Sequence, residues 1–278
     1  MSLYAHLPLG KKVAYPEHYD ASLLESVPRQ PQRAALGISG HSLPFHGEDI
    51  WTLYELSWLD TQRCPQVALG ELRVNAKTPQ LIESKSLKLY LNSFNQTCFQ
   101  QWHQVTERLQ QDLSHCVAGP VSITLQPLSY LEQQPLATLR GRCIDDQPSP
   151  WAFDDRQAPD PTLLKTLPQA ALVEEQLVSH LFKSNCPVTG QPDWASLQIH
   201  YSGPQIDPGA LLRYLLSFRR HSSFHEQCVE QIFCEIQAYC QCVQLSVLAR
   251  YTRRGGIDIN PFRSNWQAAP ANQRLVRQ

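Results

Sequence analysis

An internal repeat constrains the fold more than any other feature, because three landmarks recur in the same order at offsets of about 115 to 125 residues. The landmarks, in the first and then the second copy, are Cys64-Pro65 and Cys186-Pro187, LKLYLNSF (87–94) and LLRYLLSF (211–218), and RCIDDQP (142–148) and GGIDINP (255–261). Each match is short, but three matches in register indicate a tandem duplication of one module.

Each copy predicts the same order of strands and helices. Alternating apolar and polar residues predict half-buried strands, and apolar residues at helical spacing predict amphipathic helices. The expected elements are strands at 67–76 and 195–203, helices at 98–117 and 223–240, and closing strands at 121–128 and 245–252. This order favours an α+β fold class, with an antiparallel sheet and helices on one face of it in each module.

Two proline-rich stretches mark the module boundaries. Proline recurs without periodicity in an irregular N-terminal leader at 1–45, and proline with aspartate fills a linker at 148–169. We therefore expect the first module at 46–147 and the second at 170–278.

Composition narrows the class of protein. The 278 residues include 24 basic and 25 acidic side chains, so no basic excess indicates direct contact with nucleic acid. The N-terminal stretch lacks the apolar core of a signal peptide, and no run reaches the roughly 18 apolar residues of a membrane span. Nine cysteines without a secretory signal fit free thiols in a reducing compartment. We expect a cytoplasmic protein that does not bind membranes.

Several common motifs are absent. Neither a GxGxxG turn nor a GxxxxGK[ST] loop occurs, so a nucleotide is not held by the usual glycine-rich turns. CxxC and HExxH are also absent, and the spacings of the cysteines between 228 and 242 do not fit the common zinc patterns. We expect no metal site and interpret these cysteines as small apolar packing residues.

The stretch SNCPVTGQPDW, at 184–194, places a thiol and a carboxylate seven positions apart around a turn. Ordinary turn chemistry is one explanation. The alternative is that Cys186 is a nucleophile and Asp193 its proton partner, because the thiolate rather than the thiol attacks. In that interpretation the turn brings Asp193 back beside Cys186, where it first takes the thiol proton and later acts as an acid.

The segment LIESKSLKLY, at 81–90, combines an acidic residue, hydroxyl groups and lysines where a helix is expected to begin. A charged surface stretch is the simpler interpretation. The functional one is an anion site, because free N–H groups at a helix start bind anions and a lysine adds positive charge. The second copy has QIDPGALLRY here, so the two modules have diverged.

Two later segments carry further candidates. His225 and Glu226 could form an ordinary helix start, or could supply a proton and an acceptor for a heterocycle. The paired arginines Arg253 and Arg254, followed by two glycines, suit a phosphate, although such pairs are also common on surface turns.

These segments together resemble the NADPH-dependent 7-cyano-7-deazaguanine reductases of queuosine biosynthesis, in their long, two-module form. The resemblance covers nearly the whole chain and rests on motifs in order: YDASLLESVPR, LPFHGEDIWTLYELSWL, LIESKSLKLYLNSFNQT, LVSHLFKSNCPVTGQPDW, LLRYLLSFRRHSSFHEQC and RYTRRGGIDINPFRSN. It implies tandem tunnelling-fold modules that close into a barrel by self-association, as a homodimer. It also implies reduction of a nitrile to an amine by two NADPH through a covalent cysteine thioimide.

Carried over residue by residue, the resemblance implies a role for each candidate. Cys186 is the implied nucleophile, Asp193 the implied proton donor and His225 a further proton source. The implied contacts of the deazapurine substrate are Ile82, Glu83, Ser84, Phe224, His225 and Glu226. The implied NADPH contacts are Ser84, Lys85, Arg254 and Gly255, with Lys88 and Arg253 as weaker candidates. We expect both modules to contribute to the site.

Rival interpretations stay open from the residues alone. Cys64 also precedes a proline and has Glu71 seven positions on, but it lacks a TGQPD turn, so we interpret it as the inactive copy. A thiol-dependent hydrolase or a cyclohydrolase-like enzyme acting on a purine-like substrate would use water in place of hydride. A non-catalytic protein that binds a deazapurine or RNA is a third class.

Overall fold

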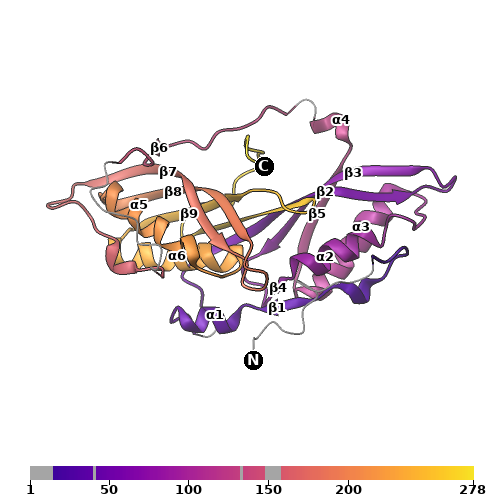
Figure 1. The fold of residues 1–278 in the computed structure, drawn as a ribbon, viewed down its shortest axis with the longest axis horizontal. Helices are drawn as coiled ribbons and strands as arrows, with labels where there is room; N and C mark the ends of the chain where they lie inside the picture. Colours follow the sequence, from indigo (N-terminus) through magenta and orange to yellow (C-terminus); the bar gives the residue numbers. More distant parts are fainter. Residues whose placement is uncertain (1–14, 40–41, 132–133, 148–157) are drawn as a thin grey trace. The chain divides into compact units, whose positions relative to one another are not determined.

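The computed structural model describes residues 15–39, 42–131, 134–147 and 158–278 (Figure 1). Contacts divide the chain into two compact units, each built from three segments. Unit 1 comprises the described residues of Met1–Gln32, Asp49–Pro135 and Arg253–Ile259, and unit 2 comprises those of Arg33–Glu48, Leu136–Thr252 and Asn260–Gln278. Parts of the expected leader (1–14, 40–41) and linker (148–157) lie outside the described residues.

The units divide the chain differently from the expected modules. Arg253–Ile259, which the sequence places in the second module, belongs to unit 1. Arg33–Glu48, from the end of the expected leader and the start of the first module, belongs to unit 2, as do residues 136–147 from the end of the first module. The reason is strand pairing. The Tyr54 N–H donates to the Gly256 carbonyl at 2.8 Å in unit 1. The backbone of Gly47 packs directly against the Phe262 carbonyl in unit 2.

Unit 1 packs helices against a sheet (Figure 1). Its elements are η1 (Ala21–Leu23), β1 (Ser26–Pro28), β2 (His46–Leu59), β3 (Pro65–Asn75), β4 (Gln80–Ile82), α2 (Ser84–Asn92), α3 (Trp102–Cys116), β5 (Val121–Gln126) and α4 (Leu128–Leu131), with α1 (Gln30–Ala35) at its boundary. The strand order is β5-β3-β2, and β1 pairs separately with β4. Leu72 of β3 and Leu109 of α3 are fully buried in one apolar cluster, as their periodicity predicts.

Unit 2 has the same plan. Its elements are β6 (Arg142–Cys143), η2 (Pro161–Leu163), β7 (Leu172–Asn185), β8 (Pro192–Pro204), α5 (Pro208–Ser217), η3 (Phe218–Arg220), α6 (His225–Cys240), β9 (Gln244–Tyr251) and most of β10 (Ile257–Ser264). The strand order is β10-β9-β8-β7-β6, antiparallel except for the pair β6–β7. Figure 1 shows α5 and α6 together over the sheet, where alternate β8 residues such as Leu197 and Ile199 are buried.

The expected α+β class, with antiparallel strands and helices, is confirmed. One pair of matched landmarks has diverged in structure. GGIDINP enters the long strand β10, whereas RCIDDQP forms only the two-residue strand β6. In the first copy Asp145 instead accepts hydrogen bonds from the Ser179 hydroxyl and the His180 N–H, at 2.7 and 2.9 Å. No helix in the described part of the chain is long and apolar enough to cross a lipid bilayer.

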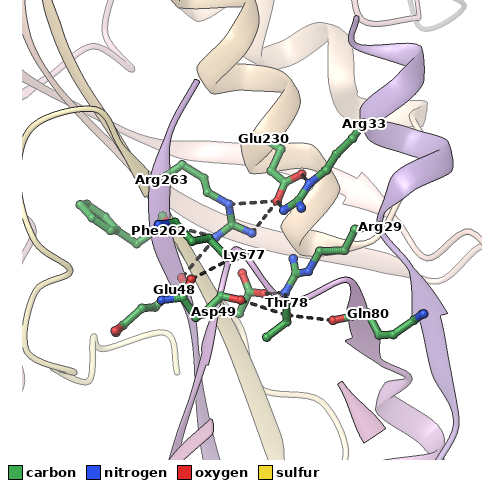
Figure 2. Close-up of polar contacts among 11 residues, drawn as sticks. Arg29, Arg33, Glu48, Asp49, Lys77, Thr78, Gln80, Glu230, Phe262 and Arg263 are labelled. Atoms are coloured by element: carbon green, nitrogen blue, oxygen red, sulfur yellow. Dashed lines mark hydrogen bonds and ion pairs between the residues drawn. The ribbon is translucent and has the colours of Figure 1, made fainter. Parts of the chain in front are cut away.

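A buried charged group ties three segments of unit 2 together. Figure 2 shows the guanidinium groups of Arg33 and Arg263 directed at the carboxylate of Glu230, a residue of α6. Arg33 donates to both oxygens of Glu230 at 2.7 and 2.9 Å, and Arg263 donates twice to one of them at 2.8 and 3.1 Å. Both guanidinium groups also lie over the Phe45 ring. We call Arg33, Glu230 and Arg263 the charged triad.

Candidate active site

Cys186 lies in the turn of a β-hairpin in unit 2. β7 ends at Asn185 and β8 begins at Pro192, and the Cys186 N–H donates to the Gln191 carbonyl at 2.9 Å, which extends the ladder by one pair. Gly190, with a φ of 69°, turns the chain in the left-handed region that favours glycine. Only 7% of Cys186 is exposed, so the hairpin presents a shielded sulfur rather than a surface thiol.

The hairpin register places Asp193 on the same side as Cys186. Asp193 of β8 pairs with Ser184 of β7, and Ser184 lies two positions before Cys186. The side chains of Asp193 and Cys186 therefore lie on the same face of the hairpin. Diagonal neighbours across an antiparallel pair have Cα atoms roughly 7–8 Å apart. The seven-residue spacing of thiol and carboxylate is therefore what this register produces, which supports the expected approach of Asp193 to Cys186.

The start of α6 is fastened to the same hairpin. The Asn185 N–H donates to the His221 carbonyl at 2.8 Å, and the Ser223 N–H donates to the Asn185 carbonyl at 3.1 Å. The chain before α6 therefore runs beside the end of β7 as a short parallel bridge. As a result, the FHE motif at 224–226 begins its helix next to the residue that precedes Cys186.

The side chains of Asp193 and His225 lie next to each other inside unit 2, where they form an ion pair when the imidazole is protonated. The Nε2 atom of His225 lies 3.4 Å from Oδ2 of Asp193, and the Asp193 side chain is almost fully buried. The imidazole also stacks on Tyr251 of β9, with ring centroids 3.8 Å apart and an angle of 12° between the planes. Sequence reasoning missed Tyr251, because in the stretch LSVLARYT it is simply the last core position of a strand.

Four further cysteines of unit 2, all in or just after α6, do not resemble reactive thiols. Burial raises the pKa of Cys228, Cys234, Cys240 and Cys242 to about 12 in each case. These thiols therefore stay protonated near neutral pH, and a protonated thiol is a poor nucleophile and a poor metal ligand. Among the residues that the structure describes, no three His, Cys, Asp or Glu side chains gather as metal ligands.

In unit 1, Glu83 caps the helix that the sequence expects to begin there. α2 starts at Ser84, and the Glu83 carboxylate accepts from the N–H groups of Lys85 and Ser86 at 2.8 and 2.7 Å. These two N–H groups are not free, so the expected use of a free helix start for an anion does not hold for them. Glu83 is fully buried, and burial raises its pKa even though the two hydrogen bonds oppose that shift.

The two glycines after Arg254 form a tight turn in unit 1. Gly255 and Gly256 have φ values of 57° and 76°, and Arg254 exchanges backbone hydrogen bonds with Ile257. Two consecutive positive φ angles define a type I′ turn, in which glycine is favoured. A Cβ atom on Gly255 would lie 3.0 Å from Nζ of Lys88. The turn therefore explains the glycines by conformation and packing, apart from any ligand.

Lys88 and Arg254 bring like charges together at this turn. Burial lowers the pKa of Lys88, and the neighbouring Arg254 guanidinium lowers it further. Arg253, by contrast, is exposed and lies over the Tyr54 ring at 4.6 Å. The site candidates thus fall into two groups, one in each unit: 82–85 with 254–255 in unit 1, and Cys186, Asp193 and 224–226 in unit 2.

The raised pKa of Glu83 predicts a pH-dependent contribution to stability. The folded chain keeps this proton at pH values where the unfolded chain has lost it, so the contribution is complete below the ordinary pKa of 4.5 and is lost as the pH rises through the raised value. We expect the free energy of unfolding of the wild type to fall with rising pH relative to that of Glu83→Gln, as measured by urea unfolding. Exposed Glu107→Gln is the control, and parallel pH profiles for the wild type and Glu83→Gln would contradict the prediction.

Two family models match most of the chain. Residues 15–125 match the model described as nitrile reductase, 7-cyano-7-deazaguanine-reductase N-term, and residues 192–270 match the model described as QueF-like protein. The two matches together span more than half of the chain. The chain belongs to the 7-cyano-7-deazaguanine reductase family, in its two-module form. The reductase is therefore an oxidoreductase of the nitrile reductase family, and its family acts in the queuosine pathway.

Among solved structures, the reductase is similar to the archaeosine synthase QueF-Like in the apo form. The identity is 15%, the similarity covers 36% of this chain and 96% of that chain, and the TM-score is 0.31. Of the site candidates in the reductase, Asp193 and 224–226 lie inside the second family match, whereas Cys186 lies between the two matches. Its assignment as nucleophile therefore depends on the hairpin geometry and on the motif around it.

Proposed function

We propose that the reductase converts the nitrile of 7-cyano-7-deazaguanine to the primary amine of 7-aminomethyl-7-deazaguanine by an NADPH-dependent four-electron reduction through a thioimide on Cys186. One observation carries the proposal. A shielded cysteine stands in a hairpin turn whose register and backbone hydrogen bonds bring a carboxylate–imidazole pair to it, in a chain of the nitrile reductase family.

The first step is addition of the Cys186 thiol across the carbon–nitrogen triple bond. Asp193 takes the thiol proton, the sulfur bonds to the nitrile carbon, and the proton is delivered to the nitrogen, which gives a neutral thioimide. Sulfur addition is useful because a nitrile carbon accepts hydride poorly, whereas the C=N group of a thioimide is a better acceptor. The burial of Cys186 and Asp193 keeps water away from this intermediate.

The second stage needs further protons at the same nitrogen. Hydride addition to the thioimide and loss of the Cys186 thiolate leave an imine, and reduction of the imine to the amine takes up another hydride and another proton. The ion pair of Asp193 with His225 gives the carboxylate a neighbour that can pass it a proton. We assign His225 as this further proton source.

Substrate contacts are proposed for residues of both groups. Ile82, Glu83 and Ser84 contribute from unit 1, and Phe224, His225 and Glu226 contribute from unit 2, with Phe224 stacking on the base. Because the Glu83 carboxylate already accepts two backbone hydrogen bonds, it binds the heterocycle with its remaining lone pairs. Its cap bonds hold the carboxylate in one orientation before substrate arrives.

The cations of unit 1 fit the phosphates of NADPH. Lys88 is held next to Arg254, and burial and this like charge both lower the pKa of Lys88, so an anion placed between them would relieve a repulsion. We propose that Ser84, Lys85, Arg254 and Gly255 bind NADPH. Lys88 and Arg253 are the secondary candidates. NADPH supplies hydride when bound.

The oligomeric state and the cellular location that we propose are those implied by the resemblance to the family. We propose a cytoplasmic homodimer whose sheets close into a barrel, because closure removes exposed strand edges. The near-equal numbers of acidic and basic residues favour a small-molecule substrate over direct contact with RNA.

The reaction is tested by following NADPH absorbance with and without the nitrile. We expect nitrile-dependent oxidation of two NADPH for each amine formed, since each hydride transfer consumes one. A thiol-dependent hydrolase would instead release ammonia from the same substrate without any loss of absorbance. That result, or turnover of NADPH without amine, would contradict the proposal.

Replacing Asp193 with asparagine tests its role as the base. Asparagine keeps the size of the side chain but cannot take the thiol proton, so we expect thioimide formation to slow by about 10²- to 10⁴-fold. Stopped-flow absorbance of the adduct, with no NADPH present, measures this step alone. Full wild-type rates in Asp193→Asn would show that another group takes the proton.

A further inference from the structure

We propose that Tyr251 is a positioning residue, the aromatic platform that holds the His225 imidazole in the orientation from which it exchanges a proton with Asp193. The role of this contact in proton transfer rests on the proposed function. The packing of Tyr251 against His225 is a structural feature of unit 2, and it can be tested without turnover.

Hydrogen bonding alone does not fix the orientation of the His225 ring. Its Nε2 atom lies 3.4 Å from the Asp193 carboxylate, which is long for a hydrogen bond. Its Nδ1 atom is buried and has no hydrogen-bond partner among the described residues. A ring held by one long contact would be free to tilt or flip. The nearly parallel stack on Tyr251, at 3.8 Å and 12°, is the contact that restricts it.

Tyr251 is itself rigidly held. Its N–H donates to the side chain of Asn260 at 3.1 Å, and its carbonyl accepts from the side chain of Gln278 at 2.9 Å. The Gln278 amide also donates to Asn260 at 2.7 Å, so the two side chains brace each other. The Phe182 ring packs edge-to-face with Tyr251, with centroids 6.2 Å apart and an angle of 84°. With 1% of its surface exposed, Tyr251 has little room to move.

The platform also suits the charge that His225 carries as an acid. Burial raises the pKa of Tyr251 well above its ordinary value, so the ring stays neutral. A positive group over a neutral aromatic face is stabilised. Among the described residues, Lys183 of β7 and Cys228 of α6 interact electrostatically with Asp193 of β8. Arg219 and Arg220 of η3 in turn interact with Lys183, and Glu226 of α6 interacts with Cys228. The neutral Tyr251 ring therefore lies against the imidazole, whereas several neighbouring side chains carry a charge.

Two substitutions separate the ring from the hydroxyl group. Tyr251→Phe keeps the stacked ring, whereas Tyr251→Leu keeps an apolar side chain without a ring. We expect Tyr251→Leu to lower kcat by about tenfold, with KM changed by less than about twofold. The alkaline limb of its kcat–pH profile moves to lower pH, because the protonated ring loses its aromatic support. Tyr251→Phe stays within about threefold of wild type, with an unshifted profile.

A chemical probe tests the platform independently of turnover. Diethyl pyrocarbonate modifies accessible imidazole nitrogens, and peptide mass spectrometry reports the rate at His225. We expect at least about fivefold faster modification in Tyr251→Leu and an unchanged rate in Tyr251→Phe. Phe233→Leu removes another fully buried ring of unit 2 and is the matched control for loosened packing.

The two readouts distinguish the possible failures. Equal rates of His225 modification in wild type and Tyr251→Leu would contradict the proposal that Tyr251 holds the imidazole. An equal acceleration in Phe233→Leu would contradict it as well. Acceleration confined to Tyr251→Leu supports the platform even if no form of the protein reduces the nitrile, in which case the proposed function is what fails. An unshifted kcat–pH profile in an active Tyr251→Leu overturns the electrostatic part of the inference.

Discussion

Replacing Cys186 with alanine is expected to abolish nitrile reduction and to prevent covalent attachment of the substrate. The wild-type chain, mixed with the nitrile in the absence of NADPH, should gain the mass of one substrate molecule in intact-protein mass spectrometry. Cys186→Ala should show no gain, and its rate of NADPH oxidation should fall by about 10⁴-fold or more, as removal of a catalytic nucleophile does in other enzymes.

The matched control for this experiment is Cys64→Ala. Cys64 has the same Cys-Pro context in the first copy of the repeat, but it is exposed and no TGQPD turn follows it. We expect Cys64→Ala to keep both the mass gain and the activity. A mass gain that survives Cys186→Ala, or one that disappears in Cys64→Ala, would contradict the assignment of the nucleophile.

The second large effect concerns stability and the charged triad. Glu230→Leu leaves the guanidinium groups of Arg33 and Arg263 buried without their shared carboxylate (Figure 2). Uncompensated buried charge is costly, so we expect the free energy of unfolding to fall by about 3–5 kcal/mol. Urea unfolding followed by far-UV circular dichroism measures the change.

Two comparisons test the reason for that loss. In the triple variant Arg33→Met/Glu230→Leu/Arg263→Met no charge remains buried at the triad, and we expect it to recover most of the stability. Arg142→Met breaks the half-exposed pair with Glu175, at 3.4 Å, and should cost no more than about 1 kcal/mol. If Glu230→Leu and Arg142→Met lower the free energy of unfolding by similar amounts, burial of the charged triad does not explain its contribution to stability.

Local patterns made part of this fold readable from the sequence. The alternation at 195–203 identified β8, and helical spacing at 223–240 identified α6, because each element buries one face in its own unit. The spacing of Cys186 and Asp193 was informative for a related reason. A hairpin turn fixes its own register, so residues close in sequence report their neighbours across the ladder.

Contacts between distant residues were not readable in this way. Arg33 of α1 and Glu230 of α6 are 197 positions apart and form an ion pair, which no local pattern encodes. Tyr251 looked like a core residue, which it is, and only the structure shows that its ring stacks on His225. Glu83 illustrates a third case. Its residue type suggested a ligand contact, but a capping carboxylate has the same sequence signature.

The three-segment construction of each unit bears on how the chain is made in the cell. Unit 1 includes Arg253–Ile259, so it is complete only when nearly the whole polypeptide has been synthesised. Domains of most multidomain proteins fold in turn as they leave the ribosome. Here the first unit waits for a late strand, and its unpaired β2 edge stays available to other chains during synthesis. If the chain were cut between the repeats, the N-terminal fragment would lack Arg253–Ile259 of unit 1 and the C-terminal fragment would lack Arg33–Glu48 of unit 2. The two halves should therefore be expressed as one polypeptide.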